Sequence, residues 1–156
     1  MGNLDFEYIG EELKETSDRS AGAREDLVKR RAIKTPKIYA YDKYACSHAT
    51  QVGNTLYVSG MASTDPEGNL VHKGDVVAQC VQSFENMKAV LEAAGGSLRD
   101  VVQYDVYVVS DVWDEISETR QHYFNSDPLP ACVGVVVADL HPPGTLIEIG
   151  AIAVVD

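Results

Sequence analysis

The stretch from Asp75 to Ser110 reads DVVAQCVQSFENMKAVLEAAGG followed by SLRDVVQYDVYVVS. Its first part repeats apolar residues every three or four positions, which predicts an amphipathic helix. Asp75 is suited to cap the start of this helix, and Gly95-Gly96 to end it. The face expected to be buried consists of Val77, Cys80, Val81, Phe84, Met87, Leu91 and Ala94.

The second part of the stretch alternates instead, with Val102, Tyr104, Val106 and Val108 on one side, and this predicts a strand. Upstream, Ser47–Gly60 reads as two strands around a Gly53-Asn54 turn. Downstream we expect a second helix from Trp113 to Phe124, then strands over 131–137 and 146–155. This order predicts an α+β two-layer domain, in which two helices cover one face of a single mixed sheet.

Composition limits the function classes. The chain has 156 residues, a formal net charge of −11 and 45% apolar residues, as expected of one soluble domain. An acidic protein is a poor nucleic-acid binder, because binding to phosphates needs a basic surface. No apolar run approaches the roughly 20 residues of a membrane span, and nothing resembles a signal peptide. With three cysteines, an odd number, we expect a cytoplasmic protein with free thiols.

Residues 1–44 differ from the rest in being highly charged, so we divide the chain into an N-terminal arm, 1–44, and a domain, 45–156. Residues 20–34 have weak helical periodicity, which predicts a helix there. We expect the arm to pack against the domain or a neighbouring subunit.

Four blocks resemble, in order, the YjgF/RidA family of reactive-intermediate deaminases: VGNTLYVSG, AQCVQSFENMKAVLEAAGGSLRDVVQYDVYVVSD, LPACVGVVVADL and IEIGAIAV. The resemblance covers about 44–155. It implies a chorismate-mutase-like homotrimer with clefts between subunits. It also implies hydrolysis of small enamines or imines to ketones and ammonia, without a metal or organic cofactor.

The chain departs from the family where the resemblance implies catalysis. The family motif Pro-Ala-Arg, whose arginine clamps a substrate carboxylate, has Cys132 at its third position. The second acid of Ile-Glu-Ile-Glu is Gly150, and the tyrosine that begins the first pocket strand is Cys46. His48 takes the place of a glutamine, and Ser117 falls near an asparagine of the second helix.

Three positions of the pattern are kept. Ser59 and Gly60 correspond to the pocket floor, and Glu148 to a residue that is structural in the family. The predicted substrate-binding residues are therefore Cys46, Ser59, Gly60, Ser117 and Gly150.

Cys132 is open to two interpretations. It is either a small apolar filler or a thiolate nucleophile. In a strand Cys46 and His48 would share a face, which would place a base beside a thiol, so the predicted catalytic residues are Cys132 and His48. A zinc site of Cys46, His48 and Cys132 is a weaker alternative, since no close-spaced ligand pair supports it. Cys80 is expected in the core.

Three functions follow. The first is a RidA-like hydrolase or lyase acting on an enamine, imine or ring-cleavage intermediate, with altered specificity because the carboxylate contact is lost. The second is a ligand-binding trimer without catalysis. The third, an endoribonuclease, is disfavoured by the acidic charge. The expected partners are a small molecule and two further copies of the chain, with no nucleic acid and no membrane.

Overall fold

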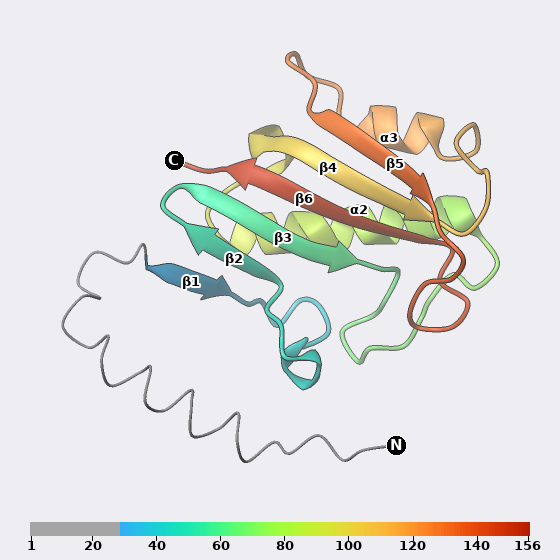
Figure 1. Ribbon diagram of the computed structural model, residues 1–156, viewed down its shortest axis with the longest axis horizontal. Helices are drawn as coiled ribbons and strands as arrows, with labels where there is room; N and C mark the ends of the chain where they lie inside the picture. Colours follow the sequence, from blue (N-terminus) through green and yellow to red (C-terminus); the bar gives the residue numbers. More distant parts are fainter. Residues whose placement is uncertain (1–28) are drawn as a thin grey trace, which may run out of the picture.

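The structure is a computed structural model and describes residues 29–156. Figure 1 shows one twisted sheet with the helices gathered on one of its faces. The strands are β1 (Arg30–Ile33), β2 (Ala49–Val52), β3 (Thr55–Met61), β4 (Val101–Val108), β5 (Ala131–Val136) and β6 (Ile147–Val154). The helices are α2 (Val76–Ala93) and α3 (Ser117–Tyr123), with short 3-10 turns η1 (Asp42–Tyr44) and η2 (Leu98–Asp100).

The six strands of the described chain are ordered β1-β2-β3-β6-β4-β5. β4 and β5 are parallel, because the chain crosses over through α3 between them, and the other pairs are antiparallel. The sheet is therefore mixed, and the predicted α+β two-layer architecture is confirmed. None of the helices within residues 29–156 is long and apolar enough to cross a membrane.

The ends of α2 are as predicted. The Asp75 carboxylate accepts a hydrogen bond from the Ala78 N–H at 2.9 Å, and Gly95 has the positive φ, 87°, that ends many helices. Cys80 is fully buried, which raises the pKa of its thiol to about 12 and confirms it as a core residue.

The buried face of α2 differs in part from the prediction. Val77 and Val81 are each 40% exposed, whereas Gln79 is fully buried. The Gln79 amide donates to the carbonyls of His72 and Gly144 and accepts from the Leu146 N–H at 2.7 Å. A buried amide is stable where every polar atom has such a partner, and hydropathy alone does not reveal those partners.

The inward face of β4 also begins differently. Tyr104, Val106 and Val108 are buried as predicted, but Val102 is exposed and Val101 is buried in its place. The pairing of β4 with β6 shifts register between Val101 and Gln103, so the alternation slips by one residue at that point.

The helix predicted over 20–34 is wrong for the described part of that range, where β1 forms instead. Arg30–Ile33 form an edge strand that pairs with β2, because pairing satisfies backbone groups along that edge. Ile33 and Ile38 lie in the core, so the sheet and its core extend into the segment assigned to the arm. The expected packing of the rest of the arm, 1–28, falls outside the described residues. The second helix is also shorter than predicted, since it begins at Ser117 rather than Trp113.

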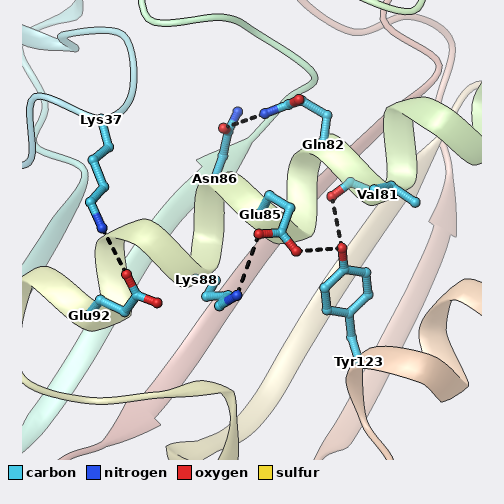
Figure 2. Close-up of polar contacts among 8 residues, drawn as sticks. All are labelled: Lys37, Val81, Gln82, Glu85, Asn86, Lys88, Glu92 and Tyr123. Carbon is cyan, nitrogen blue, oxygen red and sulfur yellow. Dashed lines mark hydrogen bonds and ion pairs between the residues drawn. The ribbon is translucent and has the colours of Figure 1, made fainter.

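Polar contacts join neighbouring segments to the outer face of α2 (Figure 2). Lys37 pairs with Glu92 at 3.0 Å, and Tyr123 of α3 donates its hydroxyl to Glu85 at 2.7 Å. The Tyr123 ring also stacks on the buried Phe84 ring, with centroids 4.6 Å apart. These contacts hold α3 against α2 and so fix the position of the other residues that α3 carries.

Candidate functional site

A first pocket of about 280 Å³ lies where β3 and β6 meet the segment before β2. It brings together the predicted residues Cys46, Ser59 and Gly60. The same pocket is lined by side chains that the sequence did not assign to a site, namely Tyr41, Tyr44, His141 and Glu148.

Glu148 is the acidic group of this pocket. Its carboxyl group lies against Gly60, where a Cβ atom would collide with it, so the glycine makes room for the acid. Burial raises the pKa of Glu148 above its usual value, and nearby His141 opposes this only in part. A carboxyl group that lines a pocket and has a raised pKa is a candidate for proton transfer to or from a ligand.

Other polar groups of the first pocket already form hydrogen bonds within the protein. The Ser59 hydroxyl donates to the Ser47 carbonyl at 2.7 Å, so toward a ligand it acts as an acceptor. The Tyr41 hydroxyl donates to the Gly60 carbonyl at 3.1 Å, and burial together with the charge of Glu148 raises its pKa to about 12. Cys46 is exposed and has only a weak contact, 3.8 Å from Sγ to the Tyr41 carbonyl oxygen.

His48 lies in neither pocket and is 2% exposed. Its Nδ1 accepts from the Thr35 N–H at 3.2 Å, and its Nε2 lies 2.9 Å from the Tyr39 carbonyl, to which it can donate. β2 begins only at Ala49, so the strand geometry that would have paired His48 with Cys46 does not apply. With both ring nitrogens engaged by the backbone, His48 orders the segment before β2 and has no nitrogen free to act as a base.

A second pocket of about 300 Å³ lies between α3 and the start of β5. It contains Cys132 and Ser117, the predicted residues of this region, together with Tyr104, Arg120 and Gln121. Cys132 pairs in register with Tyr104, so both side chains point to the helix side of the sheet. Cys132 is exposed.

Arg120 is the functional group of this pocket that our reasoning from the sequence missed. Its Nε and Nη2 donate to the Tyr104 hydroxyl at 3.1 and 2.9 Å, and Nη2 lies 3.3 Å from Cys132 Sγ. Burial raises the pKa of Tyr104, as does Cys132, while the Arg120 charge acts against them. Arg120 stands one helical turn after Ser117, a spacing that places both on one side of α3. The spacing could have indicated from the sequence that Arg120 lies near Ser117. It could not have indicated the contact with Cys132, because that contact depends on where β5 packs.

Gly150 is in β6 and belongs to neither pocket lining. It pairs with Asp105 on the sheet face away from the helices, and a Cβ atom there would meet only the Val58 carbonyl oxygen, at 3.7 Å. A side chain would therefore fit. The glycine leaves this position without an acid, and packing does not require it.

Cys46, His48 and Cys132 are not assembled into one site. Cys46 and Cys132 line different pockets, and His48 is buried apart from both. In the part of the chain that the structure describes, no group of three or more His, Cys, Asp or Glu side chains is placed to hold a metal ion. The two pockets instead offer separate chemistry, an acid in the first and a guanidinium in the second.

Comparison with known proteins identifies the class. A family model described as Endoribonuclease L-PSP matches residues 35–155. A RutC family protein of Pyrococcus abyssi is 43% identical over 109 residues, which are 69% of this chain and 84% of the relative. A 2-iminobutanoate/2-iminopropanoate deaminase of Dermatophagoides farinae is 36% identical over 111 residues, 70% of this chain and 85% of that protein.

The fold agrees with these sequence matches. The crystal structure of RidA from an Antarctic Psychrobacter superposes with a TM-score of 0.72 at 39% identity, covering 80% of this chain and 99% of that one. The protein is thus a small α+β domain of the kind found in imine and enamine deaminases. The chain belongs to the YjgF/RidA family.

Proposed function

We propose that this protein is a RidA-like hydrolase that releases ammonia from a small enamine, imine or ring-cleavage intermediate, with altered substrate specificity. The observation that carries the proposal is the Glu148 carboxyl group, which is held at a raised pKa beside Ser59 and Gly60 in the first pocket. Relatives named as imine deaminases support the reaction type.

Glu148 supplies the proton transfers in this proposal. As carboxylate it accepts a proton from water while the water oxygen bonds to the imine carbon and the C=N π electrons move to nitrogen. The same group then protonates that nitrogen. Glu148 next accepts the hydroxyl proton of the resulting carbinolamine and delivers it to the amine nitrogen, while the C=O bond forms and the C–N bond breaks. Ammonia leaves, and no redox step is involved. The Ser59 oxygen accepts a hydrogen bond from the water or the substrate nitrogen.

We further propose that the protein is a homotrimer whose clefts lie between subunits. The predicted pocket residues fall into two separate pockets within one chain, so a neighbouring copy is needed to bring an acid and a guanidinium to one substrate. The three thiols, all free, are consistent with the reducing cytoplasm.

A ligand-binding protein without catalysis is the second candidate. Cys132 and Gly150 favour it, because they occupy the positions where the resemblance implies the clamping arginine and the second acid. An endoribonuclease remains disfavoured, since a net charge of −11 opposes contact with RNA phosphates.

The deciding experiment measures ammonia release from imines generated in situ by an amino-acid oxidase. We expect the wild-type protein to accelerate hydrolysis. Glu148→Gln should lower kcat by about 100- to 10,000-fold, the usual contribution of a general acid–base group. Glu115→Gln is the matched control, because Glu115 is exposed and lines neither pocket.

Two results would contradict the hydrolase. One is wild-type protein that binds 2-oxo acids yet leaves every imine in the panel at its uncatalysed rate, which favours the binding protein. The other is a Glu148→Gln variant with full activity, which would remove Glu148 from the mechanism.

A further inference from the structure

The guanidinium of Arg120 has no acidic partner among residues 29–156. The ion pairs of that part of the chain are Lys34–Asp42, Lys37–Glu92 and Lys88–Glu85. Arg120 is instead surrounded by neutral side chains, since the second pocket is lined by no Asp or Glu. A partly buried cation is costly unless an anion compensates it. In a protein of net charge −11, a partly buried arginine that forms no ion pair with a carboxylate of residues 29–156 needs an explanation.

The guanidinium is held in place. It donates two hydrogen bonds to the hydroxyl of Tyr104, a residue only 5% exposed. Its central carbon also lies 5.6 Å from the centre of the Tyr104 ring and 6.0 Å from that of Trp113. α3 itself is fixed by the fully buried Ile116 and by the Tyr123–Glu85 hydrogen bond drawn in Figure 2. Such preorganisation reduces the entropy lost when a ligand binds.

One edge of the guanidinium remains available. Nε and Nη2 make the contacts to Tyr104 and Cys132, and Nη1 makes no hydrogen bond within the described residues. The Cys132 thiol is a weak acceptor that an oxygen anion readily replaces. Nη1 and Nη2 can therefore donate two parallel hydrogen bonds to a carboxylate that occupies the second pocket, whose volume is about 300 Å³.

We propose that Arg120 binds the carboxylate of an anionic substrate, supplying from α3 the guanidinium that the family pattern places on β5 at the position of Cys132. The inference deepens the proposed function and rests on it for the identity of the substrate as a 2-imino acid. It reverses the expectation that the cleft lacks a carboxylate contact. Cys132 is small enough to leave room for the Arg120 side chain, which gives the replacement of the family arginine a physical reason.

The test measures binding rather than turnover, with 2-oxobutanoate, the 2-oxo acid formed by hydrolysis of 2-iminobutanoate, as the probe. Its uncharged amide, 2-oxobutanamide, is the second probe. By calorimetry or NMR titration, wild-type protein should bind the acid more tightly than the amide. Arg120→Gln should weaken binding of the acid by about 10- to 150-fold, the effect of losing hydrogen bonds to a charged group, without changing binding of the amide.

Two further variants keep the test sharp. Arg120→Lys retains the charge but loses the planar guanidinium, so its affinity for the acid should lie between those of the wild type and Arg120→Gln. If Arg120→Gln folds poorly, Arg120→Lys replaces it in the test. Arg31→Gln removes an exposed arginine from β1, at the opposite edge of the sheet, and should bind both probes like the wild type. Melting temperatures of all variants identify a purely structural effect, which would weaken acid and amide alike.

Failure of this inference can be told apart from failure of the proposed function. Equal affinity of the wild-type protein for acid and amide, or no binding of the acid at all, would overturn the inference. So would unchanged acid binding by a folded Arg120→Gln protein, even if imines are hydrolysed. Acid binding that depends on Arg120, without hydrolysis of any imine, would support the inference and contradict the hydrolase.

Discussion

Glu148 is the residue whose role differs most between the resemblance, which implies a structural role, and the structure, which places it in the lining of the first pocket. It stands two residues before Gly150 on the same face of β6, so the first pocket retains one carboxyl group although the position of the second acid is a glycine. Gly60 provides the space beside it, and burial favours its neutral form. The acid that remains is therefore partly withdrawn from water, which suits proton transfer but opposes its ionisation.

Because burial disfavours the ionised form of Glu148, the stability of the protein should depend on pH. Because the folded-state pKa of Glu148 is raised above its ordinary 4.5, the stability it contributes is full below that value and is lost as pH rises through the folded pKa. Glu148→Gln does not titrate, so wild-type stability minus variant stability should fall as the pH rises from 4.5 through the raised folded-state pKa. Urea unfolding at several pH values measures this difference. Parallel profiles for the two proteins would show that the Glu148 pKa is the same in the folded and unfolded states.

At the level of single elements, α2 acts as the central connector of the fold. Its cap and most of its apolar side follow from local sequence, but its buried side chains Gln79 and Asn86 form hydrogen bonds with backbone outside the helix. Gln79 links the helix to the His72 loop and to the loop that precedes β6. The second of these loops also carries His141, which lines the first pocket.

Replacing Gln79 by methionine, which has a similar size, should remove three hydrogen bonds to partly buried backbone groups, the carbonyls of His72 and Gly144 and the Leu146 N–H. Each such hydrogen bond contributes about 0.5–1.5 kcal/mol, so we expect a loss of about 2–4 kcal/mol in the free energy of unfolding. Gln82→Met is the matched control on the same helix. Gln82 donates to the Asn86 side chain, is only half-buried and should cost less than about 1 kcal/mol. Equal losses measured by chemical denaturation would contradict the connecting role of Gln79.

For the assembled protein, the feature that matters is the sheet face opposite the helices. Tyr57 of β3, Val154 of β6, and Val133 and Val135 of β5 are exposed on it. The pairing of β3, β6, β4 and β5 places these side chains on one surface. An apolar surface across several strands is typical of an interface, which supports the proposed homotrimer.

We expect wild-type protein to sediment as a trimer and Val135→Arg to weaken association at least about 100-fold, because an unpaired charge buried in an interface costs several kcal/mol. Val77→Arg is the control. Val77 is 40% exposed against 39% for Val135, but it belongs to α2 on the other side of the sheet. Analytical ultracentrifugation at micromolar concentration decides between the alternatives. A monomeric wild type, or dissociation caused by Val77→Arg, would disprove this interface.

Local chemistry explains which features could be predicted from the amino-acid order. The cap at Asp75, the stop at Gly95, the alternation of Tyr104, Val106 and Val108, and the family blocks all depend on neighbours a few residues apart. The order of helices and strands follows from these, and with it the family. Through the resemblance, the same order also predicts that Cys132 and Gly150 stand at the positions of an arginine and an acid in the family pattern.

Contacts between distant segments could not be predicted in this way. Arg120 lies next to Cys132 because β5 pairs in parallel with β4 beneath α3, and His48 is buried because the segment before β2 folds over both of its nitrogens. A pattern of single positions records which groups are present, but not which of them are desolvated or already hydrogen-bonded. Packing sets those two properties, and they determine here that Glu148 and Arg120, rather than His48, are available to a ligand.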